Sequence, residues 1–332
     1  MNQAKIVNFA DKKIPRVGLG CMGMSDFYAP CDAETALRTL HEAYSLGYRH
    51  FDTADMYGNG ENEKLLGRFL SELGTNRNDV LVATKVGIKR LDGPKPAIAI
   101  DSSPEHVRAA VDASLQRLGV EQIGLLYLHR KSPNVPIEDT IGALAELVKS
   151  GKVRHIGLSE VSVDTLERAL KVSPICALQS EYSLWSRDVE NGMLDVCQRN
   201  GVAFVAYSPL GRGFLTGNFE RPAQGSRDLR AFLPRFQGDN FDANMRLVDA
   251  VRDIASDIGA TAAQVALAWV LAQADNIHVI PGTTKSERLT NNFASLEISL
   301  SPAQLARLAE IFNQDAVKGE RYPAEVLKTV NV

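Results

Sequence analysis

The sequence has little net charge, few cysteines and no apolar run long enough to cross a membrane. Its 332 residues include 37 Lys and Arg against 40 Asp and Glu, which leaves a formal net charge of −3. So balanced a charge provides no general attraction for nucleic acid or for an anionic membrane. We therefore expect neither as a partner.

The lack of a long apolar run and the small number of cysteines also limit the cellular setting. The longest apolar stretch, residues 260–274, includes two glutamines and is shorter than the roughly 20 residues of a membrane span, so it predicts a buried helix. The first residues, MNQAKIVNFADKK, lack the apolar core of a signal peptide. The four cysteines form no C-x-x-C pair, which is typical of a cytoplasmic protein with reduced thiols. A redox role for Cys21 is the sharper alternative.

Short β-rich runs alternate with helical patterns along the whole chain. Asp32 and Ser103 predict helix starts, and Gly47 and Gly119 predict helix ends. The expected strands are 16–20, 50–52, 80–85, 123–129, 153–158, 177–179, 203–207 and 279–281. The expected helices are 32–46, 62–73, 104–118, 137–150, 162–172, 189–200, 243–258, 261–274, 285–295 and 302–313.

Eight strand-then-helix units without a break in composition favour a parallel sheet with right-handed crossovers. We expect a single (β/α)8 barrel domain over 1–332, with extra C-terminal helices. A doubly wound sheet is the alternative, but it would need a long interruption or a second domain. Residues 211–240 after the seventh strand are too long for a plain connection, which indicates a lid or binding loop. The last residues, from Arg321 on, are expected to be a mobile tail or to dock on a neighbour.

Polar residues stand at or just past the ends of six expected strands. They are Asp52, Lys85, His129, Ser159, Gln179 and Tyr207. In a barrel the carboxyl ends of the strands share one rim, where catalysis takes place. The sequence therefore predicts a polar pocket at this rim.

Tyr57, five residues after Asp52, adds a proton donor to this rim. A neighbouring cation such as Lys85 would stabilise the tyrosinate and lower the tyrosine pKa, with Asp52 holding the lysine in place. His129 would orient a substrate oxygen or relay the proton. This set suits a reaction that builds negative charge on a carbonyl oxygen, such as hydride addition from a cofactor.

Two glycine-containing segments suggest backbone contact with a ligand. Residues 18–23 match G-x-G-x-x-G, but no helix opens directly after them, so a tight turn at Gly20 and Met22 beside a ligand is favoured over a dinucleotide fingerprint. Residues 281–288, PGTTKSER, lie between a strand and a helix and place Lys285 and Arg288 on one helix face. Helix N-termini bind phosphate well, so the segment predicts a phosphate site.

Taken together, the segments resemble the aldo-keto reductase superfamily, in its bacterial, fungal and plant branch. The matching segments are GLGCMGMS (18–25), FDTADMYG (51–58), ATK (83–85), YLHR (127–130), IGLS (156–159), QSEYS (179–183), YSPLGRGFLTG (207–217) and PGTTKSERL (281–289). The resemblance implies an NADPH-dependent barrel reductase without metal that acts on a small-molecule carbonyl. Tyr57 would be the general acid of a tetrad with Asp52, Lys85 and His129.

The resemblance also implies a set of cofactor contacts. Tyr207 would stack on the nicotinamide, and Ser159 and Gln179 would bind its carboxamide. The pyrophosphate and the 2′-phosphate end would be held by Ser208, Leu210, Gly213, Gly282, Thr283, Lys285 and Arg288, with Asn292 near the adenine. Two positions depart from the family pattern: Glu160 stands where an asparagine is frequent, and Asn291 where an acidic residue is frequent.

Other functions remain open at this stage. The potassium-channel β-subunits share this fold and tetrad, so a cofactor-binding regulatory subunit with slow turnover is the main alternative to a reductase. A sugar isomerase or aldolase would need a metal cluster or a Schiff-base lysine, and would leave Tyr57, Lys285 and Arg288 unexplained. The physiological substrate, the preferred direction and the oligomeric state do not follow from the sequence.

Overall fold

The computed structural model describes residues 5–28, 30–91, 97–223, 228–313 and 315–332, and its centre is a closed parallel sheet. The strands, in spatial and sequence order, are β3 (Leu19–Gly20), β4 (His50–Asp52), β5 (Leu81–Val86), β8 (Ile123–Leu128), β9 (Val153–Ser159), β10 (Ala177–Glu181), β11 (Ala203–Tyr207) and β12 (Ile277–Val279). Parallel bridges from Val17 to Val279 and from Gly20 to Gly282 join the two edges. The predicted (β/α)8 architecture is therefore confirmed.

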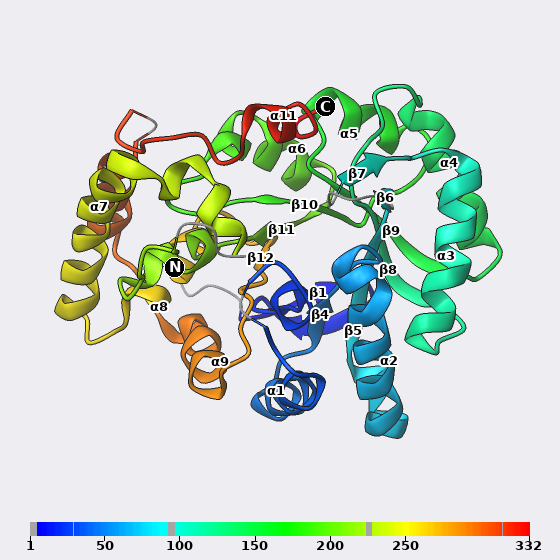
Figure 1. The fold of residues 1–332 in the computed structure, drawn as a ribbon, viewed down its shortest axis with the longest axis horizontal. Helices are drawn as coiled ribbons and strands as arrows, with labels where there is room; N and C mark the ends of the chain where they lie inside the picture. The colour runs from blue at the N-terminus through cyan, green and yellow to red at the C-terminus, as the bar shows by residue number, and fades with distance from the viewer. Residues whose placement is uncertain (1–4, 29, 92–96, 224–227, 314) are drawn as a thin grey trace.

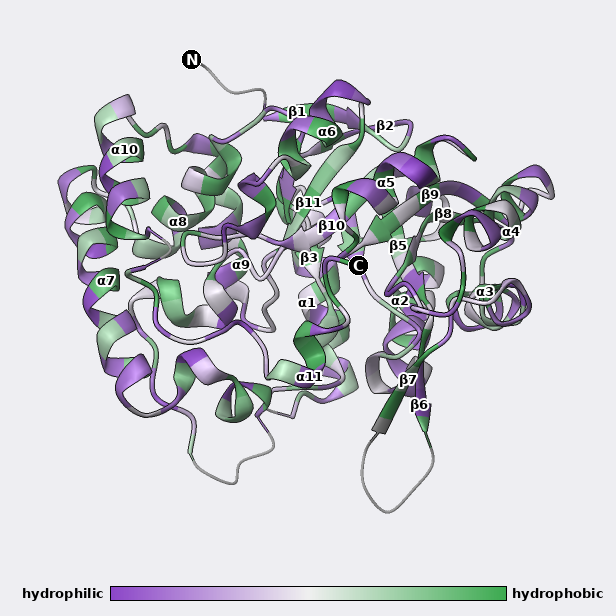
Figure 2. Ribbon diagram, turned by 90° about the horizontal axis from the view of Figure 1, so that it is seen from above, coloured by the Kyte–Doolittle hydropathy of each residue, from purple (hydrophilic) through white to green (hydrophobic). Residues whose placement is uncertain are grey.

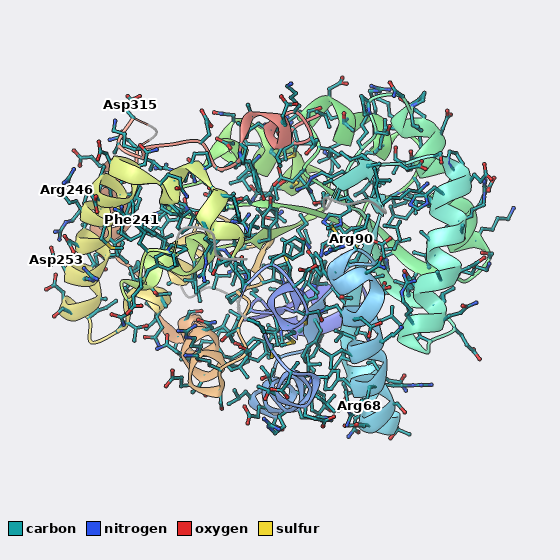
Figure 3. The ribbon with its side chains drawn as sticks, viewed as in Figure 1. Arg68, Arg90, Phe241, Arg246, Asp253 and Asp315 are labelled. Atoms are coloured by element: carbon teal, nitrogen blue, oxygen red, sulfur yellow. The ribbon has the colours of Figure 1, made fainter. Side chains whose placement is uncertain are left out.

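Helices surround this sheet (Figure 1). They are α1 (Ala33–Leu46), α2 (Glu61–Leu73), α3 (Pro104–Leu118), α4 (Ile137–Lys149), α5 (Val163–Leu170), α6 (Met193–Arg199), α7 (Gly238–Asp257), α8 (Ala262–Leu271), α9 (Ser286–Phe293), α10 (Pro302–Ile311) and α11 (Ala324–Leu327). Charged side chains such as Arg68 on α2 and Arg246 and Asp253 on α7 lie on the outward sides (Figure 3). The apolar sides pack on the sheet and form the main core.

The expected helix boundaries have clear local causes. The Asp32 carboxylate accepts a hydrogen bond from the Thr35 amide, and Gly47 ends α1 with φ 108°. Ser103 caps α3 in the same way, and Gly119 ends it with φ 63°. Such caps satisfy backbone groups that a helix end leaves unpaired, which is why these boundaries could be predicted.

The apolar stretch 260–274 forms the buried helix α8, as expected. Thr261 and Gln264 make a reciprocal capping box at its start. Among the described helices, no single one is long and apolar enough to cross a membrane; only α7 and α8 together pass that test, and they are bent by 93°.

Two antiparallel hairpins were not predicted. Strands β1 (Ile6–Phe9) and β2 (Lys12–Pro15) pair before the barrel begins. Their side chains Phe9 and Ile14 join a cluster inside the barrel with Leu125, Tyr127 and Val205, so this hairpin closes one end of the barrel. The second hairpin, β6 (Ile88–Leu91) with β7 (Ala97–Ile100), projects beyond the ring of helices (Figure 2).

Two long segments are more ordered than expected. The loop after β11 contains the short 3-10 helices η5 (Gly211–Thr216), η6 (Leu229–Phe232) and η7 (Pro234–Phe236), and α7 already begins at Gly238; residues 224–227 lie outside the described part. The tail was expected to be mobile or to dock on a neighbour; in the described residues it is held against its own barrel instead of extending freely, and docking on a neighbour stays a prediction. The tail packs on its own barrel, because Arg321 forms an ion pair with Glu160 and the Asn331 amide bonds to the Glu160 carbonyl.

Candidate active site

The strand ends bring the predicted polar residues to one rim. Asp52, Ser159 and Tyr207 are the last residues of β4, β9 and β11, and His129 directly follows β8. Lys85 lies one residue before the end of β5. Gln179 was expected at a strand end, but β10 continues to Glu181, so Gln179 lies two residues deeper.

Tyr57 reaches this rim on a tightly turned loop. It begins the 3-10 helix η2 (Tyr57–Gly60), in which Gly58 and Asn59 have positive φ values of 57° and 55°. The buried Asn62 fastens the loop: its amide accepts from the Thr53 hydroxyl at 2.6 Å and donates to the Cys21 carbonyl at 2.9 Å. Tyr57 is therefore held by local backbone geometry and by a polar side chain, neither of which is visible in hydrophobic periodicity.

Lys85 is the hub of the constellation. Its Nζ donates to a carboxylate oxygen of Asp52, to the Thr53 carbonyl at 2.7 Å and to the Tyr57 hydroxyl at 3.5 Å. Asp52 and Lys85 are almost fully buried. The His129 ring lies edge-on to the Tyr57 ring, with centroids 6.0 Å apart. The structure thus brings all four predicted residues together.

Burial opposes the lysine in setting the tyrosine pKa. Burial raises the pKa of Tyr57 above its usual value, and the nearby Lys85 cation offsets only part of this effect. For Lys85, burial lowers the pKa, but Asp52 and Tyr57 outweigh it and the net shift is upward. Lys85 does lower the pKa of Tyr57, as expected. The net shift of that pKa is nevertheless upward, because the effect of burial is larger.

His129 is held in its neutral form. Burial lowers its pKa well below the usual value, and the cations Arg130 and Lys85 add to the shift. Its Nδ1 is buried and has no hydrogen-bond partner within the described residues. A neutral imidazole can donate one ring N–H to a substrate oxygen and carries no extra proton to supply.

The predicted carboxamide-binding side chains are engaged with protein groups. The Gln179 amide donates to the second carboxylate oxygen of Asp52 at 2.7 Å. The Ser159 hydroxyl accepts from Arg130, whose guanidinium also donates to the His129 carbonyl at 2.8 Å. Arg130 was not singled out from the sequence, because only the fold shows that a residue after His129 turns back into the rim.

The segment after β11 turns sharply at the same rim. Ser208, Gly211, Arg212 and Gly213 all have positive φ values, between 48° and 95°. At Gly211 a side chain is excluded, because a Cβ would lie 2.7 Å from the Trp185 ring. The Gly211 and Gly213 amides donate to the Ser208 and Leu210 carbonyls at 2.9 and 3.0 Å, so the turn is held by its own backbone.

The segment 281–292 forms the other half of the predicted phosphate site. Gly20 and Gly282 approach so closely that a Cβ on Gly282 would lie 2.9 Å from the Gly20 carbonyl. Lys285 and Arg288 are exposed at the start of α9 and form no ion pair within the described chain. Asn292 is buried, whereas Asn291 accepts from the Thr261 hydroxyl at 2.8 Å and so supports α8.

Metal and thiol chemistry receive no support from the described residues. They contain no group of three or more His, Cys, Asp or Glu side chains that could hold a metal ion. Cys21 is completely buried, and burial raises the pKa of its thiol far above the usual value. A buried thiol of this kind is a poor redox sensor, because the reactive species is the thiolate.

Comparison with known proteins gives a consistent result. The model of the aldo/keto reductase family matches residues 16–313. The NADP(+) aldo-keto reductase yakc of Schizosaccharomyces pombe is 40% identical over 93% of this chain and 92% of its own length. A probable aldo-keto reductase of Glycine max is 41% identical over 93% of this chain and 89% of its own.

Solved structures agree with these sequence matches. A glycerol dehydrogenase from Gluconobacter oxydans superposes with a TM-score of 0.83 at 29% identity, covering 93% of this chain and 94% of the other. An aldo/keto reductase from Klebsiella pneumoniae, solved with NADP and acetate, superposes with a TM-score of 0.73 at 25% identity, covering 96% and 99%. The likeness extends over nearly the whole barrel.

Proposed function

The chain belongs to the aldo/keto reductase family, and we propose that it reduces aldehydes or ketones to alcohols with Tyr57 as the general acid. It is an NADP-dependent oxidoreductase that acts on carbonyl groups. The observation that carries the role of Tyr57 is the contact of its hydroxyl with the buried Lys85–Asp52 pair beside neutral His129.

Bound NADPH would supply the hydride that adds to the carbonyl carbon. Tyr57 donates its proton to the carbonyl oxygen, and its high pKa keeps that proton in place at neutral pH. Lys85, 3.5 Å from the hydroxyl, stabilises the tyrosinate that remains. Asp52 fixes Lys85 at this distance by accepting from Nζ.

His129 positions the carbonyl oxygen by a hydrogen bond. Because its pKa lies far below neutral, it does not carry an extra proton to relay. Its edge-on contact with Tyr57 supports a role as an orienting group in the pocket. Of the two roles expected for this residue, orientation is the one we propose.

The residues of the rim fit a phosphorylated dinucleotide. The exposed cations Lys285 and Arg288 at the start of α9 would bind the 2′-phosphate, with Gly282 and Thr283 beside them and Asn292 near the adenine. Ser208, Leu210 and Gly213 would hold the pyrophosphate in the turn after β11, and Gly20 and Met22 would contribute backbone from the neighbouring loop.

The nicotinamide end would be held at the centre of the rim. Tyr207 would stack on the ring. Ser159 and Gln179 would bind the carboxamide after exchanging their present contacts with Arg130 and Asp52.

The decisive experiment compares wild type with Tyr57→Phe in NADPH oxidation with a panel of aldehydes. We expect a loss of roughly 10²–10⁴-fold in kcat with NADPH affinity nearly unchanged, because only the proton donor is removed. Tyr44→Phe is the matched control, since it removes an exposed hydroxyl that only approaches Asp79. Full activity in Tyr57→Phe would remove Tyr57 from this role.

The same experiment addresses the regulatory alternative. Tight NADPH binding by wild type without multiple turnovers on any aldehyde or ketone would favour a slow subunit of the potassium-channel β type. Sustained turnover with free substrate would favour the reductase.

A further inference from the structure

Glu160 directly follows β9 in a strained and buried position. Its φ is +55°, in the left-handed region that side chains other than glycine seldom adopt, and it is 2% exposed. Its carboxylate accepts from Arg321 through two nearly parallel bonds, of 3.0 and 2.8 Å, and from the Glu181 amide at 2.9 Å. A strained conformation of this kind persists only where the surrounding structure holds it, and here the paired carboxylate holds Glu160 in place.

The same residue also holds the far end of the tail. The Asn331 amide donates to the Glu160 carbonyl at 2.8 Å, and the Ser162 amide donates to the Val332 carbonyl at 3.2 Å. Residues 321–332, here called the strap, are thus attached near both ends to the loop that follows β9. The short helix α11 lies between the two attachments.

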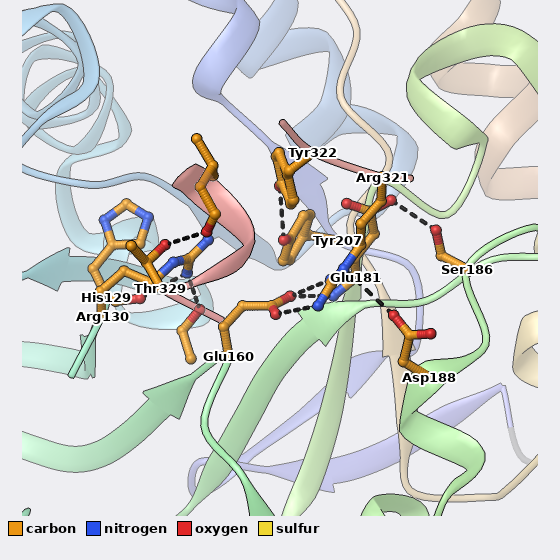
Figure 4. Close-up of polar contacts among 12 residues, drawn as sticks. His129, Arg130, Glu160, Glu181, Ser186, Asp188, Tyr207, Arg321, Tyr322 and Thr329 are labelled. Carbon is orange, nitrogen blue, oxygen red and sulfur yellow. Dashed lines mark hydrogen bonds and ion pairs between the residues drawn. The ribbon is translucent and has the colours of Figure 1, made fainter. Parts of the chain in front are cut away.

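The strap brings Tyr322 against the rim. The hydroxyls of Tyr322 and Tyr207 lie 3.0 Å apart, and Arg212 donates to the Tyr322 hydroxyl at 2.8 Å. Figure 4 shows Arg321 between Glu160 and Asp188, with Tyr322 facing Tyr207. The strap is therefore fixed to Glu160, and Tyr322 near its start contacts Tyr207, the tyrosine proposed to stack on the nicotinamide.

We propose that Glu160 is a positioning residue that clamps the strap across the mouth of the active site, so that Tyr322 restrains Tyr207 and slows cofactor release. The proposal rests on the proposed function for its cofactor step, but the clamp itself is a property of the protein alone. We assign Glu160 to the strap rather than to the carboxamide, because its carboxylate is held in a buried ion pair with Arg321 and also accepts from the Glu181 amide.

The buried ion pair between Glu160 and Arg321 makes the clamp testable by comparing single substitutions with the double substitution. The side chains of Glu160 and Arg321 are 1% and 6% exposed, so removing one partner breaks the buried ion pair and leaves Arg321 only its 3.4 Å contact with the half-exposed Asp188. Removing both charges relieves that penalty. The two substitutions should therefore be strongly non-additive, whereas two unconnected changes would add.

The variants are Glu160→Gln, Arg321→Gln and the double variant, with Glu325→Gln as the matched control. Glu325 also lies on the strap, and within the described residues its carboxylate pairs only with the exposed Lys328. Hydrogen exchange of peptides from the strap is followed without cofactor, with peptides from β8 as an internal reference. NADPH release is followed separately by its fluorescence after rapid mixing.

We expect both single variants to speed exchange in the strap at least about tenfold, because breaking a buried pair by one partner is strongly destabilising. Exchange in β8 should stay unchanged. NADPH release should accelerate by a similar factor. In the double variant, each of the two rates should increase by less than the product of the increases in the single variants. The control should match wild type in both measurements.

Unchanged exchange in the strap of both single variants, or strictly multiplicative effects in the double variant, would overturn the clamp. Faster exchange with an unchanged NADPH release rate would overturn the gating step. Failure of wild type to bind NADPH would count against the proposed function instead, and the exchange measurement on the protein alone would still decide whether the clamp exists.

Discussion

The stability of the barrel should depend on the protonation of His50, at the start of β4. Both of its ring nitrogens are buried without a hydrogen-bond partner in the described structure. The ring packs edge-on against Phe9 of the closing hairpin at 5.4 Å. Burial lowers the pKa of His50 from 6.5 to about 4, and the balance between Asp52 and Lys85 does not reverse this.

The sign of the pH effect on stability follows from the downward shift of the His50 pKa. The unfolded chain binds the proton more tightly than the folded barrel, so acid favours unfolding. The contribution of the neutral His50 to the free energy of unfolding is fully present above about pH 6.5 and is lost as the pH falls toward 4. At about 1.4 kcal/mol per pKa unit, the shift corresponds to about 3 kcal/mol of the free energy of unfolding. His278, which is also buried and has a pKa well below normal, changes stability in the same direction.

The assay is chemical denaturation of wild type and His50→Gln at about pH 7, 5.5 and 4.5, with midpoints compared at constant slope. The glutamine stays neutral, so the advantage of wild type over the variant should shrink steadily below about pH 6.5. His41→Gln is the control, since His41 is half-exposed and pairs with Glu72 at the surface. Parallel loss of stability by wild type and His50→Gln across this range would refute the reasoning.

Two further predictions concern the site. Lys285→Ala with Arg288→Ala should weaken NADPH roughly a hundredfold and NADH little, because two charge-assisted contacts to the 2′-phosphate are lost; equal losses measured by fluorescence titration would argue against that site. Lys85→Met should abolish carbonyl reduction and lower the free energy of unfolding by about 3–5 kcal/mol, since Asp52 is left unpaired. Adding Asp52→Asn to Lys85→Met should restore much of the lost stability but not the activity. Restored turnover in this double variant would show that the Lys85–Asp52 pair serves only folding.

Much of the barrel could be predicted because its signals are local. Helix caps such as Asp32 and Ser103 act within one turn, and their helices begin where expected. Strand β11 was predicted with the same bounds as observed. Helix α6 is shorter than the expected 189–200, because residues 188–190 form a separate 3-10 turn before it. The two hairpins were missed because their strands are only four residues long and lie outside the repeating units.

The sequence by itself determined the alternation of eight strands and helices and the set of residues at the strand ends, because periodicity, caps and motif spacing are properties of neighbouring residues. Only the tertiary structure decided what depends on burial and on distant partners. Burial turned the net pKa shift of Tyr57 upward and made His129 neutral. The contact of Glu160 with Arg321, 161 residues apart in the chain, converted an apparent departure from the family pattern into an anchor for the tail.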